Sequence, residues 1–390
     1  MTKRLTLSIY FFATFLQSGA YGLTFLLPLL FHDFGANEKD VGNVLAVTAI
    51  SALITIYFLG YFITKWGYMN SIGISSIFIA ISLFIFAEIT NTGFLSYFAG
   101  ILLGIGWGVF YVLTPIVLTE ITDKQQRVQI FTLLSVFIMA GFGLSPVFGD
   151  LLVKSNYNVS HVFTLSCVFS LMSGILFFAL KKSVASLSSR KTIEHSHKML
   201  TLSKLKKVMR SSAARPIIMV GLGASVFAAI TNFQTIYAQE NGLDYSLYFL
   251  FYTITVIICR VLFARFSGGK SPYGVIASLL AIMAMSVFLF IFIDGNALLY
   301  IFGAILFGVG YGVSYPIVKA MASQDAEPHL FDETMQIFGF SYFIGVFGFP
   351  FIAGWIIVTQ NILILLFLAF ALSVIECFLA LRRHLERINL

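Results

Sequence analysis

The chain has 390 residues, of which 59% are hydrophobic and 11% are charged. This composition is far more apolar than that of an average soluble domain, so it excludes a soluble globular protein. The formal net charge of +7 could indicate a nucleic-acid partner. The positions of the basic residues exclude that interpretation, because these residues follow the alternating loops of a membrane protein.

A transmembrane helix needs about 20 predominantly apolar residues. In chain order, segments of this kind fall at 5–31, 41–64, 71–90, 95–119, 129–153, 160–180, 216–238, 246–267, 272–293, 297–321, 334–358 and 361–381. A transmembrane β-barrel would instead show roughly 10-residue segments of alternating polarity, and the sequence contains none. We therefore predict an all-α integral membrane protein with twelve transmembrane helices.

The two halves of the chain are related by an ungapped shift of 204 positions. Segment 104–111 then aligns with segment 308–315, so that three glycines coincide and Trp107 falls on Tyr311. The same shift aligns two further residues of the fifth span with residues of the eleventh, Gly141 with Gly345 and Pro146 with Pro350. Such self-similarity indicates a duplicated structural unit.

Basic residues predict the orientation in the membrane. Nearly all Lys and Arg lie in loops on the side of the N-terminus, whereas Lys39 and Lys154 lie on the opposite side and Arg260 lies within a span. The positive-inside rule then places both termini in the cytoplasm and the protein in the cytoplasmic membrane. The first apolar segment is about twice as long as the 7–15-residue core of a signal peptide, which favours a first span. The expected domains are a six-helix bundle over 1–180, a basic cytoplasmic linker over 181–215 and a second six-helix bundle over 216–390.

Polar and aromatic residues share helix faces in the first half. Gln17 and Tyr21 are four residues apart in span 1, and Trp107 and Tyr111 are four apart in span 4. Glycines at steps of four in span 4 allow close helix packing. In span 5, Pro146 removes a backbone hydrogen bond and is expected to bend the helix.

The linker contains His195 and His197, which form a weak metal signal because no third ligand is nearby. A solvated linker is the simpler interpretation, and we expect no metal and no cofactor. The three cysteines lie in separate spans, which argues against a disulfide framework.

The second half carries a cation within a span. Placing Arg260 near the bilayer centre costs roughly 2.5–3.5 kcal/mol on insertion scales, so it is expected to face a wet cavity and to bind an anionic group. Bonding to helix-end carbonyls and snorkelling to the interface remain open alternatives. Other polar and aromatic residues of this half are Asn232, Gln234, Tyr311, Tyr315, Gln336 and Tyr342.

Two halves of six spans and a basic central loop resemble the major facilitator superfamily over essentially the whole chain. One stretch that carries the resemblance is Gly60-x3-Thr64-Lys65-x-Gly67, which is similar to the family's motif between spans 2 and 3. The family has Asp at the position of Thr64, and that Asp helps to latch the two halves together. The counterpart in the second half has Gly268 in the Asp position.

A second stretch is Gly141-x3-Ser145-Pro146-x2-Gly149, which is similar to the span 5 motif associated with drug–proton antiporters. Ser145 and Asp150 occupy positions where the family has glycine. The resemblance implies a transporter that works by alternating access.

Arg260 and Arg265 resemble the end of span 8 in many efflux members of the family. Span 12 is usually peripheral in this fold, so we expect Glu376 to be protonated or to snorkel rather than to carry protons. Spans 1, 2 and 4 contain no Asp or Glu. Proton coupling is therefore implied by the resemblance alone.

Segment 264–271 matches a loosened phosphate-loop pattern. A true phosphate loop follows a β-strand, whereas this segment follows a membrane span, so we expect a turn. Without a catalytic motif in the sequence, we expect no enzyme.

The expected substrate site lies near the membrane midplane at the interface of the repeats. The residues expected to form it are Gln17, Tyr21, Trp107, Tyr111, Asn232, Gln234, Arg260, Tyr311, Tyr315, Gln336 and Tyr342. The residues expected to support conformational change are Gly60, Thr64, Lys65, Gly67, Gly141, Ser145, Pro146, Gly149 and Pro350.

We predict a secondary active transporter that exports a small polar or anionic organic molecule in exchange for protons. The substrate would be a drug-like compound or a metal-chelating, siderophore-like metabolite. Uptake of a carboxylate or sugar is the alternative within this class, and a membrane sensor that moves no solute is the alternative from another class. The expected partners are the substrate, protons and the lipid bilayer, with no nucleic acid, and we expect a monomer.

Overall fold

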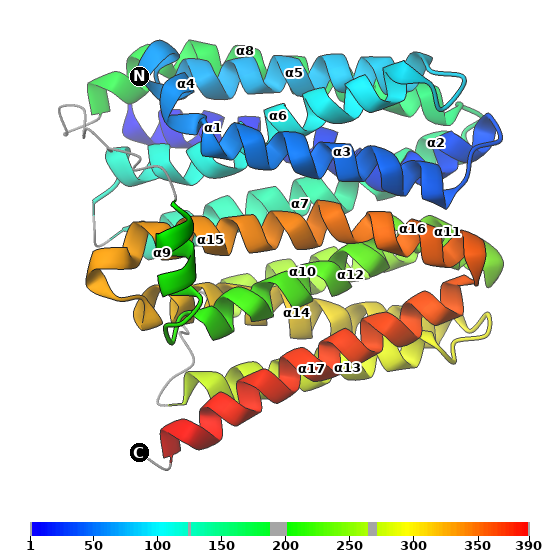
Figure 1. Cartoon of the computed structure of the whole chain (residues 1–390). Helices are drawn as coiled ribbons and strands as arrows, with labels where there is room; N and C mark the ends of the chain where they lie inside the picture. Colours follow the sequence, from blue (N-terminus) through cyan, green and yellow to red (C-terminus); the bar gives the residue numbers. More distant parts are fainter. Residues whose placement is uncertain (1, 124–125, 188–200, 264–270, 389–390) are drawn as a thin grey trace. The chain divides into compact units, whose positions relative to one another are not determined.

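The computed structural model describes residues 2–123, 126–187, 201–263 and 271–388 (Figure 1). Within these residues all regular structure is helical. Twelve of the described helical segments are long and apolar enough to cross a membrane. The prediction of an all-α membrane protein with twelve spans is therefore confirmed.

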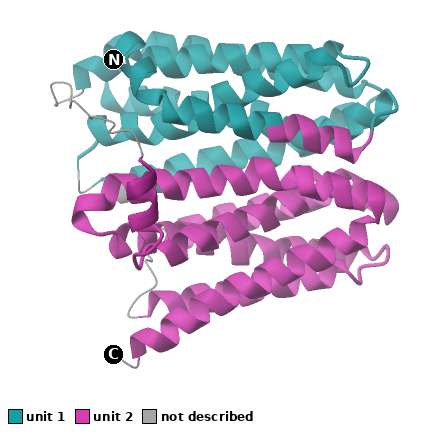
Figure 2. Ribbon diagram, viewed as in Figure 1, with its two compact units in different colours: residues 1–36, 47–198 teal, residues 37–46, 199–390 magenta. Residues whose placement is uncertain are grey.

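The chain divides into two compact units (Figure 2). The first comprises residues 1–36 and 47–198, and the second comprises residues 37–46 and 199–390. The first two turns of the second span thus group with the second half of the chain. The elements up to the linker are α1 (Lys3–Gly22), the 3-10 helix η1 (Leu23–Leu26), α2 (Leu27–Asp33), α3 (Glu38–Tyr57), α4 (Leu59–Trp66), α5 (Tyr68–Glu88), α6 (Phe94–Ile121), α7 (Arg127–Lys154) and α8 (Val159–Leu187).

The second half is built from a corresponding series of helices and adds a short helix before its first span. Its elements are α9 (Leu202–Val208), α10 (Ala214–Asn232), α11 (Gln234–Glu240), α12 (Tyr245–Leu262), α13 (Pro272–Phe290), α14 (Ala297–Asp325), the 3-10 helix η2 (Pro328–Leu330), α15 (Phe331–Phe343), the π-helix η3 (Ile344–Gly348), α16 (Phe349–Thr359) and α17 (Ile362–Ile388).

The same helix pairs contact each other in both units. In the first unit, α5 packs against α6 and α8, and α1 packs against α7 and α8. In the second unit, α13 packs against α14 and α17, and α10 packs against α15, η3 and α17. These pairs correspond under the shift of 204 positions, so the repeat in the sequence is also a repeat in the packing.

Glycines at equivalent positions allow these helices to approach closely. A Cβ atom at Gly106 would lie 2.7 Å from the Ser75 carbonyl oxygen of α5, and one at Gly310 would lie 2.8 Å from the Leu279 carbonyl oxygen of α13. Any larger residue would therefore force the backbones apart, as expected for small residues between membrane helices.

Equivalent hydrogen bonds join the same helix pairs. The Ser82 hydroxyl donates to the Ala99 carbonyl at 2.7 Å, and the Ser286 hydroxyl donates to the Gly303 carbonyl at 2.8 Å. Donor and acceptor are both shifted by 204 positions between the two bonds. A buried hydroxyl needs such a partner in an apolar medium.

The first span of each half is interrupted toward its C-terminal end. In the first half, α1 ends at Gly22 and passes through η1 into α2, which carries Pro28 in its first turn. In the second half, α10 ends at Asn232 and α11 begins at Gln234. Broken first spans of this kind are common in transporters built from repeats.

The two spans that carry the aligned prolines differ in detail. Pro146 lies inside α7, which remains α-helical over 28 residues. Pro350 lies in the first turn of α16, directly after the π-helix η3. Proline has no N–H to donate to the preceding turn, and here that turn is the wider turn of the π-helix η3.

The part of the linker that the structure describes is more ordered than expected. Helix α8 continues to Leu187, and α9 packs against α15, where Lys204 forms an ion pair with Glu333. Residues 181–187 thus extend α8, and residues 202–208 form α9. His195 and His197 lie outside the described residues.

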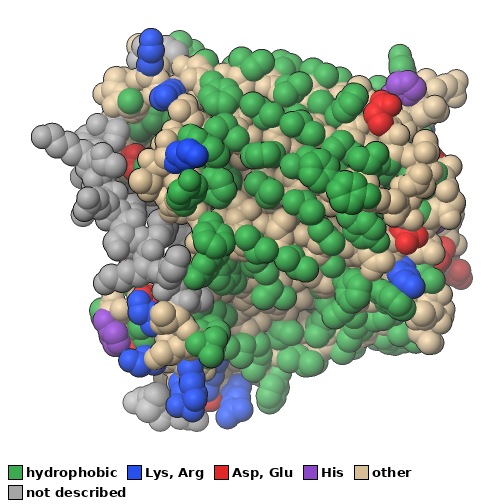
Figure 3. Space-filling model, turned by 45° about the horizontal axis from the view of Figure 1, so that its top comes forward, with side chains coloured by type: hydrophobic (Ala, Val, Ile, Leu, Met, Phe, Trp, Pro, Cys, Tyr) green, Lys and Arg blue, Asp and Glu red, His purple; other side chains and the backbone are tan. Residues whose placement is uncertain are grey.

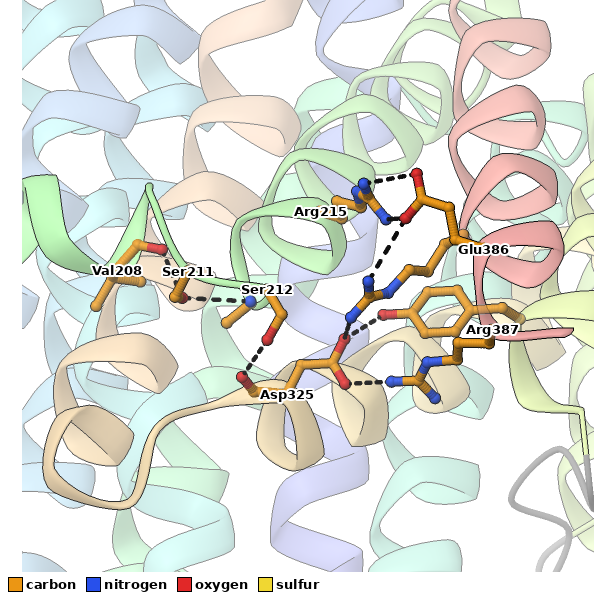
Figure 4. A network of polar contacts seen from close by, with 10 residues as sticks. Val208, Ser211, Ser212, Arg215, Asp325, Glu386 and Arg387 are labelled. Atoms are coloured by element: carbon orange, nitrogen blue, oxygen red, sulfur yellow. Dashed lines mark hydrogen bonds and ion pairs between the residues drawn. The ribbon is translucent and has the colours of Figure 1, made fainter. Parts of the chain in front are cut away.

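A charge network joins four helices at one end of the second unit (Figure 4). Asp325, at the end of α14, forms ion pairs with Arg383 and Arg387 of α17 and accepts a 2.8 Å hydrogen bond from the Tyr273 hydroxyl of α13. Arg215 of α10 donates two hydrogen bonds to the Glu386 carboxylate of α17. The network fixes the ends of these helices to one another.

The face drawn in Figure 3 is covered mainly by apolar side chains, and most charged side chains lie near the helix ends. Large apolar residues such as Ile50, Phe98 and Phe378 are 59%, 37% and 61% exposed. Side chains of this kind, exposed along helices long enough to span a bilayer, are suited to contact lipid.

Gly141 provides a test of the close packing. A Cβ atom there would lie 2.6 Å from the Phe15 carbonyl oxygen, and one at the equivalent Gly345 would lie 2.7 Å from the Gly221 carbonyl oxygen. We expect Gly141→Ala and Gly345→Ala each to destabilise the folded protein by about 1–3 kcal/mol through overpacking. Thermal unfolding in detergent measures this effect.

The matched control is Gly339→Ala in α15, because a Cβ atom at Gly339 meets no other atom within 4 Å. Alanine is the better helix former, so this variant should unfold at or slightly above the wild-type temperature. Three variants with the same unfolding temperature would contradict the role given to the two glycines.

Candidate functional site

In the first unit, three aromatic rings from three helices pack together. Tyr21 of α1 stacks on Trp107 of α6 with centroids 4.1 Å apart, and Phe142 of α7 lies 5.2 Å from each of them. Trp107 is only 2% exposed. Tyr111, one turn further along α6, is half-buried and lies 6.2 Å from Trp107.

In the second unit, an equivalent row of rings follows α14. Phe227 of α10 stacks on Tyr311 with centroids 4.8 Å apart, and Tyr315 follows at 6.2 Å. Tyr342 of α15 lies 5.3 Å from Tyr315. Trp107 and Tyr311, aligned by the repeat, therefore each stack on a ring from the first helix of their own unit.

Arg260 reaches α14 beside this row. Its Nε–H donates to the Gly312 carbonyl at 3.5 Å, and the side chain is half-buried. Gly312 lies directly after Tyr311 in α14. The guanidinium thus lies next to the tyrosine row. The carbonyl that it bonds lies in the middle of α14 and not at a helix end.

The predicted amide residues form hydrogen bonds within their own units. Gln17 of α1 exchanges hydrogen bonds with the Ser170 hydroxyl of α8 at 3.0 and 3.1 Å. Gln234 donates to the Tyr300 hydroxyl at 2.6 Å, and Asn232 donates to the Ala228 carbonyl at 3.0 Å. All three amides are buried. Gln336 is half-buried on α15.

Glu376 of α17 lies at the tyrosine row, which the sequence did not indicate. Its side chain is 3% exposed and lines a cavity with Gly223 of α10 and with Tyr311 and Tyr315 of α14. The carboxylate therefore does not snorkel toward the interface. The lone acid in span 12 was visible in the sequence, but its neighbours depend on how α10, α14 and α17 pack.

The predicted motif between spans 2 and 3 forms a helix end and a turn. The Thr64 hydroxyl donates to the Gly60 carbonyl of its own helix at 2.8 Å, and Gly67 turns the chain with a φ of 74°. The Lys65 ammonium lies 5.6 Å from the Trp66 ring centroid. The counterpart around Gly268 lies outside the described residues.

The span 5 motif lies where α7 meets the first span. The Ser145 hydroxyl donates to the Phe142 carbonyl at 3.4 Å. A Cβ atom at Gly149 would lie 2.7 Å from the Leu26 side chain. These small residues let α7 pack against α1 and η1.

A seam between the start of α3 and α16 was not predicted. A Cβ atom at Gly42 would lie 2.6 Å from the Pro350 carbonyl oxygen. The Lys39 ammonium lies 3.7 Å above the Trp355 ring, which is a cation–π contact. Pro350, expected to support conformational change, is thus in direct backbone contact with α3.

Comparison with known proteins gives a family and a fold. The family model described as Major Facilitator Superfamily matches residues 7–350. The Quinolone resistance protein NorA of Staphylococcus aureus, in strains N315 and COL, is 27% identical over 181 residues, which are 46% of this chain and 46% of that protein. The chain thus matches about half the length of these curated relatives.

Two solved structures share the fold. The nucleoside transporter NupG aligns with a TM-score of 0.79 at 15% identity, covering 98% of this chain and 99% of that chain. The human organic anion transporter MFSD10 (TETRAN) aligns with a TM-score of 0.64 at 14% identity, covering 97% of this chain and 100% of that chain. At these identities the likeness concerns the fold alone.

The pair Gln234 and Tyr300 tests whether a predicted amide stabilises its own unit. Gln234→Leu leaves the buried Tyr300 hydroxyl without its 2.6 Å partner, and we expect a loss of about 1–3 kcal/mol in stability. The double variant Gln234→Leu/Tyr300→Phe removes both polar groups and should recover most of that loss. Thermal unfolding of the four proteins of the cycle measures the coupling, and additive effects would contradict it.

Proposed function

Because the chain belongs to the Major Facilitator Superfamily, we propose that it is a secondary active transporter that moves a small polar or anionic organic molecule across the cytoplasmic membrane. The observation that carries the proposal is the ring stack repeated in both units, Tyr21 on Trp107 and Phe227 on Tyr311. Transporters built from repeats use equivalent elements of each repeat at the substrate site and expose it to each side in turn.

The proposed chemistry of the substrate follows from Arg260 and the tyrosines. A guanidinium has five N–H donors, so Arg260 can bond the Gly312 carbonyl and a carboxylate together. Tyr315, half-buried at the end of the row, offers a ring on which a planar molecule can stack. An aromatic carboxylate, such as a drug-like compound or a metal-chelating metabolite, suits this combination.

We propose export in exchange for protons as the direction. Two observations support it, the similarity of Gly141–Gly149 to the motif of drug–proton antiporters and the 27% identity to a Quinolone resistance protein over part of the chain. The predominance of Lys and Arg in the loops on the N-terminal side supports cytoplasmic termini. We further propose that one chain suffices for transport.

Vesicles containing the purified protein test the direction. With an acidic lumen, a fluorescent quinolone carboxylic acid should enter the lumen against its own gradient, and a protonophore should abolish the accumulation. Accumulation driven instead by an acidic exterior would indicate proton-coupled uptake. Binding without flux of the quinolone or of a nucleoside would indicate a sensor and would contradict the proposal.

Arg260 tests the anionic preference. We expect Arg260→Ala to weaken quinolone binding by about 2 kcal/mol or more if the ion pair is desolvated. Arg260→Lys should restore only part of the affinity, because an ammonium cannot form a bidentate pair with a carboxylate. Binding is measured by fluorescence titration of the purified protein.

The control for this titration is Arg210→Ala, which removes an exposed Arg near the start of α10. Wild-type affinity in Arg260→Ala would remove Arg260 from the site. Equal losses in Arg260→Ala and Arg210→Ala would show that only the net charge matters.

A further inference from the structure

Glu376 differs from the other buried carboxylates that the structure describes. Its Oε2 atom has no hydrogen-bond partner among the described residues, although the side chain is only 3% exposed. By contrast, Asp150 pairs with Lys154, Glu333 pairs with Lys204, and Asp325 pairs with arginines of α17. Among the buried carboxylate oxygens of the described residues, Oε2 of Glu376 is the one without a hydrogen-bond partner.

The carboxylate is held against the backbone of α10. A Cβ atom at Gly223 would lie 2.9 Å from Oε2 and 3.0 Å from Oε1 of Glu376. On the other side, Tyr311, Ser314 and Tyr315 of α14 line the same cavity, whose volume is about 10 Å³. This is close to the smallest cavity that can hold one water molecule. The site thus combines an acid, hydroxyl groups and room for a water.

Few charged groups face this site from the surrounding helices. The titratable residues of α14 nearest to it are Tyr311 and Tyr315, and Lys319 lies one turn beyond Tyr315. The titratable groups on the helices that pack against α17 are engaged with other partners. Arg215 of α10 binds Glu386, Tyr273 of α13 binds Asp325, and α16 has no titratable residue. On α17 itself, the Cys377 thiol donates to the Ala277 carbonyl.

An ionised carboxylate in such a place needs a cation or several hydrogen-bond donors, because burying an unpartnered charge is costly. Burying the neutral acid costs far less than burying the charge, so the arrangement seen here suits a protonated Glu376. Separation of α14 from α17 would admit water and let the acid ionise. Whether Glu376 holds a proton therefore depends on how closely α14 and α17 pack.

We propose that Glu376 is the proton-binding site through which this transporter is driven. The proton passes from water to a carboxylate oxygen of Glu376 and later returns to water on the other side of the membrane, and no other bond forms or breaks. The inference rests on the proposed function for its link to transport. The link is physical, because Tyr311 and Tyr315 line the proton site and also form the ring row beside Arg260.

Infrared spectroscopy of the purified protein tests the proton site without any substrate. Titration from about pH 7, where exposed carboxyl groups are already ionised, to alkaline pH should remove a carboxylic-acid carbonyl band in the wild type. That band should be absent in Glu376→Gln and present in Glu88→Gln, which changes an exposed acid at the end of α5. An unchanged spectrum in Glu376→Gln would overturn the proposal.

If Glu376→Gln fails to fold, Gly223→Ala is the second test variant, because it keeps the Glu376 carboxyl group but displaces it. The added methyl group would lie only 2.9 and 3.0 Å from the two carboxylate oxygens, so the carboxylate must move and the midpoint of the titration should shift. A midpoint identical to that of the wild type would show that the titrating acid does not lie at α10.

Vesicle assays then separate the proton site from the transport function. For one-to-one exchange, a gradient of about one pH unit can drive accumulation of a quinolone carboxylic acid by about tenfold. Glu376→Gln should lose this accumulation but keep exchange of labelled for unlabelled quinolone. Gradient-driven accumulation in Glu376→Gln equal to that of the wild type would overturn the assignment. Wild-type protein that neither accumulates nor exchanges the quinolone would instead refute the proposed function, while the infrared result would still decide the proton site.

Discussion

Hydrocarbon offers no hydrogen-bond partner, and this constraint explains most of the structure. Many polar side chains within the spans pair with a neighbouring helix, as Gln17 does with Ser170 and Ser286 does with the Gly303 carbonyl. Because apolar side chains gain little by leaving lipid, helices are joined instead by close backbone contact at small residues. Gly106 and Gly310 provide this contact at equivalent places.

The two halves share their helix packing but differ in the charged residues within their spans. Arg260 aligns with Ile56 and Glu376 aligns with Met172 under the shift of 204 positions, so the first half has no counterpart of either charge. Both side chains approach α14: Arg260 bonds the Gly312 carbonyl, and Glu376 lines a cavity together with Tyr311. In our proposal the second unit therefore carries both the anion-binding group and the proton.

Much of the fold was predictable, because span length and glycine spacing are local properties of a sequence. The aligned glycines predicted a duplicated unit, and each one lies at an equivalent helix contact. The partners of Gln17 and Gln234 could not be predicted, since they depend on the rotation of α1 against α8 and of α11 against α14. The neighbours of Glu376 were missed for the same reason: its contact with Gly223 exists only once α10 and α17 are packed. No sequence pattern distinguished the π-helix before Pro350 from the regular helix around Pro146.

The central claim is that substrate movement and the protonation of Glu376 are one coupled process. The most direct measurement is the luminal pH of vesicles, followed with a trapped dye, after a quinolone carboxylic acid is added outside without an imposed gradient. The account predicts that quinolone entry raises the luminal pH in wild-type vesicles and leaves it unchanged in Glu376→Gln vesicles. Equal pH changes in both, or quinolone entry into wild-type vesicles without any pH change, would contradict it.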